Sequence, residues 1–437
     1  MQKKRNRRLL FGVSFVLAAS FVTGIFIAFG QEKDSAEAVP GEALPLLDVD
    51  YTPSLPQIPS ALPEVSNESV IFLHDEHTGA ERALTIDPVL QSHMDRFIKQ
   101  SGEPIATVVI AEVSTGKILA MSQGRHPSLW GGNSHTALHA GFPAASLFKT
   151  TVALAGAEIA NLKPGFMQAF SGSCQEVAKN GSWLVDKLYG NIRVMTLQEA
   201  YGDSCNTFFA KLAVNVVGYN AIREYLGKLG WNGRVGTDFA LRQSPKLLPS
   251  IEDSATDTVG RFAAGFGDVG LSAIHEAWIN LSIANDGKAL PVILFQDSIK
   301  NQIIESNPAL HPTLFSKQTA QTMRALMTAT VRGGTARSAF RKPRYHEFYS
   351  ETGGKTGTLN VRLPQGVGNW FAGMTPIEKP EVVVVAFVLL EGRWVLRASA
   401  LAAEAFWAYE NLHKGKRENT LASRPSLVDA EHMLILR

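Results

Sequence analysis

The sequence predicts an α+β fold in which helices cover a central antiparallel sheet, preceded by one membrane-spanning helix. Three observations support this prediction: an apolar run follows a basic N-terminus, two short apolar strands precede a series of helical segments, and three more strands lie near the C-terminus. Strands at both ends of a domain can meet in one sheet and carry the intervening helices on its faces. The 437 residues are 45% hydrophobic and 19% charged, which is an ordinary globular composition.

The N-terminal segment has the pattern of a membrane anchor. Residues 9–30 carry no charge, and a helix rising about 1.5 Å per residue is long enough at this length for the roughly 30 Å hydrocarbon core of a bilayer. Basic residues precede the run, which places residues 1–8 in the cytoplasm and the chain after Gln31 outside it. A cleaved signal peptide is the alternative, although its apolar run is normally only about 7–15 residues long.

The chain after the anchor divides into a linker, one domain and a tail. Residues 31–67 are rich in Pro, Ala, Ser and acidic residues, which is typical of a flexible linker. We expect the folded domain over 68–415 and a C-terminal tail over 416–437. The net charge is +2, and the basic residues of the N-terminus more than account for it, so no nucleic-acid surface is predicted.

Periodicity and turn signals predict the elements of the domain in order. Apolar residues at helical spacing indicate a helix to residue 99, which Pro88 opens. Apolar runs at 106–112 and 117–122 flank a Ser-Thr-Gly turn and predict a hairpin. Further helices are predicted at 146–161 and 397–413, mixed helical segments at 196–217 and 271–286, and further strands at 353–360, 369–374 and 381–390. The last strand is apolar on both faces, as expected of a central strand covered on both sides.

The sequence contains two cysteines, Cys174 and Cys205. Two are too few for a disulfide scaffold or for a zinc site built from Cys. They could pair in an oxidising compartment, but we expect two isolated buried thiols.

Ser146 and Lys149 form a Ser-x-x-Lys motif, which alone is a weak signal because chance produces about one match in a chain of this length. Ser114 and Lys117 match it as well. Ser114 lies in a predicted turn, whereas Ser146 opens an apolar helix, in which a spacing of three places both side chains on one face. Burial would lower the pKa of Lys149 so that its neutral amine takes the Ser146 proton, near the N–H groups of a helix N-terminus.

Ser204 and Asn206 form the only Ser-x-Asn motif of the chain. With Cys205 toward the core, both polar side chains could face one cleft. The hydroxyl can relay a proton to a leaving amine, and the amide can hold a substrate carbonyl. The alternative is a polar helix cap.

The only Lys-Thr-Gly motif comprises Lys355, Thr356 and Gly357 on a predicted strand, followed by Thr358. A phosphate loop is excluded because position 349 is Tyr where such a loop requires Gly. On a strand, the Lys355 cation can attract a substrate carboxylate, and Gly357 leaves room for a ligand backbone. The N–H of Thr358 can then stabilise an oxyanion.

In this order and on these elements, the three motifs resemble the active-site set of penicillin-binding proteins and serine β-lactamases. Other segments extend the resemblance to the transpeptidase domain of penicillin-binding proteins, over about residues 84–412. They are Leu-Thr-Ile-Asp at 84–87, Gly-Phe-Gly-Asp at 265–268, Ile-Ala-Asn-Asp-Gly at 283–287, Gly-Thr-Ala at 334–336 and Trp-Phe-Ala-Gly at 370–373. The fold implied is the β-lactamase/transpeptidase-like fold.

The resemblance implies a serine-type D,D-transpeptidase of peptidoglycan synthesis. A D-Ala-D-Ala stem peptide would acylate Ser146 and release D-Ala, and the acyl group would pass to an amine of a neighbouring stem. The N–H groups of Ser146 and Thr358 would form the oxyanion hole, and β-lactam antibiotics would inhibit covalently. With the anchor, this places the chain in the bacterial cytoplasmic membrane with a periplasmic domain. No metal or organic cofactor is expected, because Ser, Lys and backbone dipoles supply the chemistry.

The chain departs from the family between the anchor and the domain, where there is too little sequence for a glycosyltransferase domain or a large N-terminal module. Docking of a partner through such a module is therefore not expected, and a membrane glycosyltransferase is a candidate partner. A D,D-carboxypeptidase would use the same residues with water as acceptor. A β-lactamase would need a further group to activate water; Tyr-Gly-Asn at 189–191 resembles a class D motif but precedes Ser204 instead of following it. A non-catalytic β-lactam sensor or divisome scaffold is the last alternative.

Overall fold

The computed structural model describes most of the predicted domain. The described residues are 58–59, 62–63, 70–74, 79–124, 135–175, 177, 182–183, 191–231, 233, 235–241, 256–266, 269–297, 311–362, 364–392 and 395–415. The predicted anchor at 9–30, both predicted tails and most of the predicted linker lie outside these ranges. Within them, no helix combines the length and apolar character needed to cross a membrane. Ile58, in the segment predicted as a linker, is buried in the larger core.

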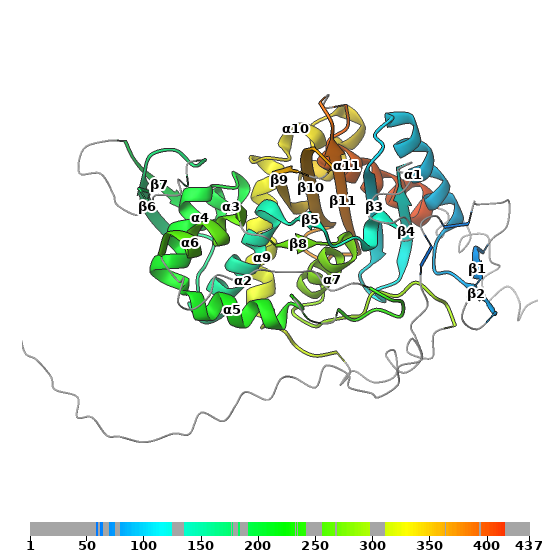
Figure 1. The fold of residues 1–437 in the computed structure, drawn as a ribbon, viewed down its shortest axis with the longest axis horizontal. Coiled ribbons are helices and arrows are strands. Elements are labelled where there is room, and N and C mark those ends of the chain that lie inside the picture. The colour runs from blue at the N-terminus through cyan, green and yellow to red at the C-terminus, as the bar shows by residue number, and fades with distance from the viewer. Residues whose placement is uncertain are drawn as a thin grey trace, which may run out of the picture. The chain divides into compact units, whose positions relative to one another are not determined.

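A five-stranded antiparallel sheet forms the centre of the domain, in the order β4-β3-β11-β10-β9 (Figure 1). Its strands are β3 (Ala106–Glu112), β4 (Ile118–Gln123), β9 (Gly353–Val361), β10 (Gly366–Thr375) and β11 (Val382–Leu390). The predicted hairpin and the three predicted C-terminal strands are confirmed. Strand β3 pairs with β11, so the first and last strands meet in one sheet as expected.

One row of residues runs straight across this sheet. Lys355 on β9 lies opposite Ala372 on β10, and Ala372 lies opposite Val385 on β11. Val385 is opposite Val109 on β3, which in turn pairs with Met121 on β4. The position of Lys355 is therefore set by the pairing register of all five strands.

The sheet separates two hydrophobic cores, and β11 contributes alternately to both. Val383, Val385 and Phe387 belong to one core, while Val384 and Ala386 belong to the other. This alternation explains why the strand is apolar at every position, since neither face meets water.

The helices are distributed over the two faces of the sheet. They are α1 (Pro88–Ser101), α2 (Lys149–Ile159), α3 (Leu197–Gly202), α4 (Asn206–Leu212), α5 (Tyr219–Lys228), α6 (Thr256–Arg261), α7 (Ala273–Ala284), α9 (Lys317–Arg332), α10 (Arg337–Phe340) and α11 (Ala398–Ala408). The 3-10 helices are η2 (Thr136–Leu138), η3 (Ala145–Phe148) and η7 (Pro343–Tyr349), and the π-helices are η4 (Ala213–Val217), η5 (Phe262–Phe266) and η8 (Tyr409–Lys414). Helices α1 and α11 pack in one core, and α2, α7 and most of α9 pack in the other.

Two helix predictions show how local chemistry sets the boundaries. Helix α1 starts where predicted: Pro88 occupies its first turn, and the Asp87 carboxylate accepts hydrogen bonds from the N–H groups of Val89 and Leu90 at 2.8 and 3.2 Å. The mixed helical segments predicted over 196–217 are confirmed as α3, α4 and η4. The break falls at Ser204, whose φ of +57° is left-handed and ends α3 before α4 begins.

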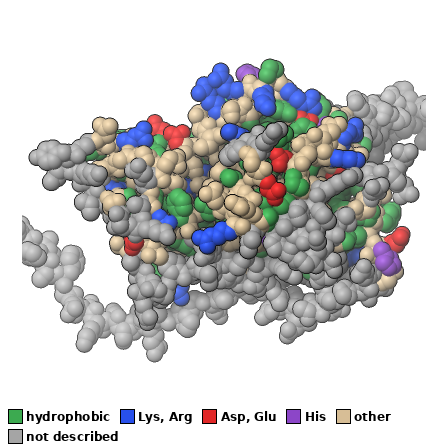
Figure 2. Space-filling model, turned by 45° about the horizontal axis from the view of Figure 1, so that its top comes forward, with side chains coloured by type: hydrophobic (Ala, Val, Ile, Leu, Met, Phe, Trp, Pro, Cys, Tyr) green, Lys and Arg blue, Asp and Glu red, His purple; other side chains and the backbone are tan. Residues whose placement is uncertain are grey.

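A buried carboxylate joins η7 to α11 behind the sheet. Glu404 is 2% exposed and accepts hydrogen bonds from the Arg344 guanidinium at 2.8 and 2.9 Å and from the Tyr345 hydroxyl at 2.6 Å. Figure 2 shows Lys and Arg side chains gathered at the end of the domain where α10 and η7 lie, and Arg341 and Lys342 are exposed there. Glu404 therefore anchors one cation of this basic surface to the core.

Three two-stranded sheets complete the fold. They are β1 (Phe72–His74) with β2 (Glu81–Ala83), β5 (Phe142–Pro143) with β8 (Gly270–Leu271), and β6 (Met167–Ser171) with β7 (Ile192–Thr196). The β6–β7 ribbon lies at the end of the domain farthest from β1 and β2 in Figure 1.

The prediction of two isolated thiols is wrong, because Cys174 and Cys205 form a disulfide. They are 31 positions apart in sequence, but their Cα atoms lie 4.5 Å apart. Cys174 follows β6 directly, and the antiparallel pairing of β6 with β7 returns the chain to α3 and Cys205. The proximity depends on this ribbon, which residue spacing alone does not reveal.

Candidate active site

Ser146 lies in a tight turn that leads directly into α2. The turn is the 3-10 helix η3, in which residues three apart are eclipsed, so Ser146 lies directly over Lys149 at the start of α2. The Ser146 Oγ and Lys149 Nζ atoms are 2.7 Å apart. The preceding residue, Ala145, has a left-handed φ of +51°, a strained conformation of the kind that gathers at functional sites. The predicted shared face of the two side chains is confirmed, although the first turn is 3-10 rather than α.

Lys149 is completely buried and has three partners. Besides Ser146, its Nζ donates to Asn206 Oδ1 at 2.8 Å and to the main-chain oxygen of Ala264 at 2.6 Å. Burial lowers the pKa of Lys149 well below its ordinary value, and the positive charge of Lys355 lowers it further. A neutral amine has two N–H groups for the two oxygen acceptors and one lone pair for the Ser146 hydroxyl. The geometry thus matches an amine that accepts the Ser146 proton.

The Ser-x-Asn motif lies between α3 and α4 and points its two polar side chains to the site. The side chain of Cys205 between them is fully buried, as predicted. Asn206 is the first residue of α4 and Cys205 is its N-cap, and no side chain caps this helix. The helix-cap alternative for Ser204 is therefore wrong.

Lys355 on β9 is the second buried amine of the site. It is 1% exposed, and its Nζ donates to Ser204 Oγ and to the main-chain oxygen of Thr356, both at 2.9 Å. Burial lowers the pKa of Lys355 to about 7. Its Nζ also lies 5.5 Å from the centre of the Tyr201 ring, close enough for a cation–π interaction. Each lysine is therefore paired with one side chain of the Ser-x-Asn motif.

The strand that carries Lys355 passes close to the Ser146 turn. A Cβ atom at Gly357 would lie 3.2 Å from the Ala144 oxygen and 3.4 Å from the Leu147 nitrogen, so a larger residue would crowd β9 against the turn. Beyond it, the Thr358 hydroxyl accepts a hydrogen bond from Asn369 Nδ2 at 3.0 Å. Thr358 and Ser146 line the same cleft, as an oxyanion hole built from their N–H groups requires.

A cleft of about 360 Å³ opens over these groups, a volume suited to a small ligand or a peptide end. Of the predicted site residues, five line it: Ser146, Ser204, Asn206, Thr356 and Thr358. Lys149 and Lys355 lie behind this lining, and Gly357 packs against the Ser146 turn. The fold therefore brings all eight predicted residues together. Other lining residues include Gln175, Asp203, Thr335, Arg397 and Ser399.

Sequence reasoning missed three contributors to the site. The Ala264 oxygen binds Lys149, and a main-chain acceptor leaves no mark in residue type. Gly265 has φ +95° and packs on the peptide of Ala145 and Ser146. Thr335 Oγ1 lies 2.5 Å from Thr356 Oγ1, and its N–H donates to the Gly202 oxygen at 3.1 Å. For Gly265 and Thr335, the sequence did hold a signal, because both lie in the segments that extend the family resemblance, at 265–268 and 334–336.

The titratable groups that the structure describes suggest neither a metal centre nor a second catalytic acid at the serine. Among the described residues, no group of three or more His, Cys, Asp or Glu is arranged to hold a metal ion. Over the same ranges, no carboxylate hydrogen-bonds to Ser146 or Lys149, whose partners are an amide, a hydroxyl and a peptide oxygen. The described hydrogen-bond partners of Ser146 and of the two lysines are therefore hydroxyl, amine, amide and peptide-oxygen groups.

Two curated relatives share part of the chain. It is 23% identical over 347 residues to the probable peptidoglycan D,D-transpeptidase PbpC of Pseudomonas aeruginosa, covering 73% of this chain and 56% of that protein. It is 26% identical over 206 residues to the peptidoglycan D,D-transpeptidase PbpA of Mycolicibacterium smegmatis, covering 44% of this chain and 38% of that protein. The chain thus spans about half of the first relative's length and less of the second's.

Solved structures share the fold. Penicillin-binding protein 3 of Mycobacterium tuberculosis, complexed with ampicillin, matches with a TM-score of 0.58 at 20% identity, covering 75% of this chain and 77% of that one. A peptidoglycan glycosyltransferase from Burkholderia ambifaria matches with a TM-score of 0.58 at 20% identity, covering 76% and 98%. These matches confirm the expected transpeptidase-type fold, with its central antiparallel sheet and flanking helices. A family model described as the penicillin binding protein transpeptidase domain matches residues 106–406. The chain therefore belongs to the penicillin-binding protein transpeptidase family.

Proposed function

We propose that this chain is a peptidoglycan D,D-transpeptidase that crosslinks stem peptides through an acyl-enzyme on Ser146. The observation that carries the proposal is the buried amine of Lys149, which lies 2.7 Å from Ser146 Oγ and 2.8 Å from Asn206 Oδ1. The two relatives named as D,D-transpeptidases support the reaction. The ampicillin complex of a protein with the same fold supports covalent inhibition by β-lactams.

In the acylation step, the neutral amine of Lys149 takes the Ser146 hydroxyl proton as Oγ attacks the carbonyl carbon of the penultimate D-Ala. The C–N bond to the terminal D-Ala then breaks. The leaving amine needs one proton, which the Ser204 hydroxyl donates and recovers from Lys355, 2.9 Å away. An acceptor amine of a second stem then attacks the ester carbonyl, and its proton passes through the Ser204 hydroxyl to Lys355. The bond from the carbonyl carbon to Ser146 Oγ breaks as Lys149 returns its proton to Oγ, so both lysines regain their starting protonation states.

The strand β9 binds and polarises the substrate. The Lys355 cation attracts the terminal carboxylate toward the Thr356 and Thr358 hydroxyls that line the cleft. The N–H groups of Ser146 and Thr358 stabilise the oxyanion that forms during attack. Asn206 holds a substrate carbonyl with the part of its amide that does not bind Lys149.

In hydrolysis of the acyl-enzyme, water replaces the acceptor amine as the nucleophile, and a base must activate this water. The third partner of Lys149 is the Ala264 peptide oxygen, which cannot accept a proton as a carboxylate does. This disfavours the β-lactamase alternative, and no observation favours a carboxypeptidase or a non-catalytic sensor. We further propose that residues 9–30 anchor the domain outside the bacterial cytoplasmic membrane, where its substrate lies, beside a separate glycosyltransferase.

Intact-mass spectrometry of the detergent-solubilised chain with benzylpenicillin tests the nucleophile. One stable penicillin adduct is expected on the wild type and none on Ser146→Ala. Ser114→Ala is the matched control, because Ser114 also begins a Ser-x-x-Lys sequence but lies in an exposed turn; it should acylate normally. A wild type without any adduct would refute the proposal, and rapid loss of the adduct would establish a β-lactamase.

Product analysis separates transfer from hydrolysis. A stem pentapeptide is incubated with the wild-type chain, with and without an acceptor amine. A crosslinked product that requires the amine is expected. Release of D-Ala with the tetrapeptide as the only product would instead identify a D,D-carboxypeptidase.

A further inference from the structure

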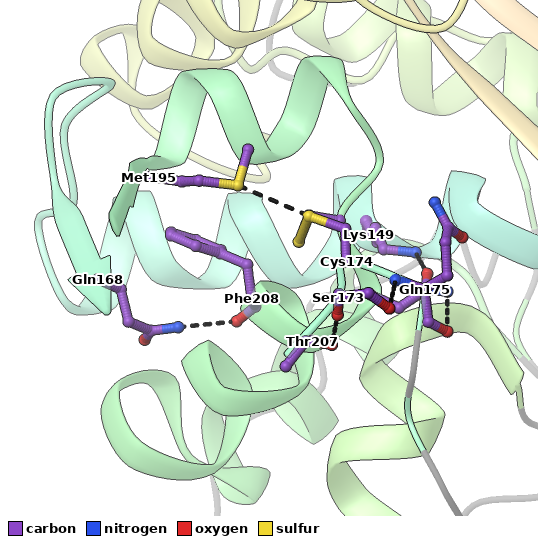
Figure 3. The surroundings of a disulfide bond; sticks show 10 residues. Lys149, Gln168, Ser173, Cys174, Gln175, Met195, Thr207 and Phe208 are labelled. Atoms are coloured by element: carbon purple, nitrogen blue, oxygen red, sulfur yellow. Dashed lines mark hydrogen bonds between the residues drawn. A yellow bond between two sulfur atoms is a disulfide. The ribbon is translucent and has the colours of Figure 1, made fainter. Parts of the chain in front are cut away.

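Helix α4 begins inside the Ser-x-Asn motif without a cap of its own. The first N–H groups of a helix need outside acceptors, and the Ser204 side chain, which could act as one, instead binds Lys355. Their acceptor is Cys174: its main-chain oxygen binds the N–H of Asn206 at 2.7 Å and that of Thr207 at 3.3 Å. A segment that follows β6 therefore supplies the cap that the motif lacks. Figure 3 shows Ser173, Cys174 and Gln175 of this segment close to Thr207 of α4.

The same segment orients the Asn206 side chain. Its amide has an oxygen end and an NH₂ end, and only the oxygen can accept the hydrogen bond from Lys149. The NH₂ end donates to the Gln175 main-chain oxygen at 3.4 Å. If the Asn206 amide were flipped, its NH₂ group would face the Lys149 N–H donors, and its oxygen would face the Gln175 main-chain oxygen. The acceptor at Gln175 thus selects the orientation that Lys149 requires.

Two further links tie this segment to α4. The Thr207 hydroxyl donates to the Ser173 oxygen at 2.7 Å, and Gln168 Nε2 of β6 donates to the Phe208 oxygen at 3.0 Å. The covalent link is the disulfide from Cys174 to Cys205, the middle residue of the motif. It joins the half-buried Cys174, beside the exposed Gln175, to the fully buried Cys205.

We propose that the Cys174–Cys205 disulfide is a positioning device for acylation: it holds residues 173–175 against α4 so that Asn206 presents its oxygen to Lys149. This inference rests on the proposed function of Ser146. When the disulfide is reduced, only hydrogen bonds retain the segment, and the 3.4 Å bond that orients the Asn206 amide loses its covalent support. The acylation machinery then reaches full activity only in an oxidising compartment, such as the space outside the cytoplasm.

The experiment measures the second-order rate of acylation of the full chain, in detergent, by a fluorescent penicillin. Oxidised protein is compared with protein that has been reduced with a dithiol. The sulfur atoms of Cys174 and Cys205 take up two electrons and two protons, and the dithiol is oxidised to a cyclic disulfide. We expect about tenfold slower acylation after reduction, restored by reoxidation with oxidised glutathione. Cys174→Ala/Cys205→Ala should be equally slow and insensitive to the dithiol, because the chain has only these two cysteines.

A double-mutant cycle separates positioning from general stabilisation. If the disulfide acts through the amide, reduction should not slow Asn206→Ala any further, so the two losses are not additive. Circular dichroism on reduced native protein verifies that it remains folded, and this sample carries the test if the double Cys variant does not fold.

Two results would overturn the inference alone: equal acylation rates of oxidised and reduced wild type, or the same fold loss on reduction in Asn206→Ala as in the wild type. If the oxidised wild type forms no adduct at all, the proposed function fails and the positioning role fails with it. The two failures are therefore distinguishable in one series of samples.

Discussion

Replacement of Gly265 by Ala tests whether the Ser146 turn is held by the main chain on which it packs. A Cβ atom at Gly265 would lie 2.3 Å from the Ala145 oxygen and 3.1 Å from the Ser146 nitrogen. Both contacts are with main-chain atoms, so no side-chain rotation relieves them. The φ of +95° adds a conformation that residues with a Cβ rarely adopt.

The magnitude follows from these two costs. Ordinary contact begins at 3.4 Å, so the two segments must separate by roughly 1 Å. Left-handed backbone costs about 1–2 kcal/mol for a residue with a Cβ, and overpacking typically adds about 1–3 kcal/mol. We therefore expect Gly265→Ala to lose about 2–5 kcal/mol of unfolding free energy. A displacement of roughly 1 Å at a reacting group can slow its chemistry about 10²-fold, so acylation of Ser146 should slow by about this factor.

The assay combines the acylation rate with fluorescent penicillin and denaturant unfolding of each variant. Gly102→Ala is the strain control, because Gly102 has φ +73° with nothing within 4 Å of a Cβ; it should lose about 1–2 kcal/mol and acylate normally. Gly227→Ala in α5 is neither strained nor crowded, and should be neutral or stabilising by up to about 1 kcal/mol. Wild-type acylation by Gly265→Ala would refute the reasoning.

Three further results are expected. Lys149→Met keeps the buried volume but removes the base, so adduct formation should slow by about 10²–10⁴-fold in the mass assay. Burial lowers the pKa of Lys355 to about 7, so its cation is present below that pH and lost above it. Penicillin binding, measured by saturation kinetics, should therefore weaken as the pH rises through 7. The Lys355→Arg variant keeps its charge and should not show this fall. Burial alone would raise the pKa of Glu404, but hydrogen bonds from Arg344 and Tyr345 lower it overall. The Glu404 carboxylate therefore stabilises the folded domain at pH values above its unfolded-state pKa. This stabilisation is lost as the pH falls through the folded-state pKa. Glu404→Gln should lower the unfolding free energy at neutral pH by about 2 kcal/mol without changing acylation; an unchanged denaturation midpoint would contradict that.

Sequence alone predicts those parts of the fold that local patterns determine. Strand β11 is recognisable because every position meets a core, and α1 because Pro88 and the cap at Asp87 mark its start. Ser146 and Lys149 are recognisable as a pair because any helical turn brings residues three apart onto one side. The neighbouring Ser114 shows the limit, since the same spacing in a turn between strands creates no site.

The remainder depends on contacts between segments that are distant in sequence. The disulfide requires the β6–β7 ribbon to return Cys205 to Cys174, and two cysteines in a chain carry no information on their distance. The third partner of Lys149 is a peptide oxygen at Ala264, which any residue type would supply. Thr335 meets Thr356 because α9, which precedes Thr335, packs against both α3 and β9. Such features follow from the assembled fold and not from local pattern.

The row of paired residues that crosses the sheet has a consequence for how this chain can change in length over evolution. Lys355, Ala372, Val385, Val109 and Met121 lie side by side on successive strands. Insertion or deletion of one residue within β10 or β11 would turn every following side chain of that strand to the opposite face, and would shift β9 past the Ser146 turn by about 3.3 Å. Length variation among natural variants should therefore be confined to the connections between strands, and the interiors of the strands should vary only by substitution.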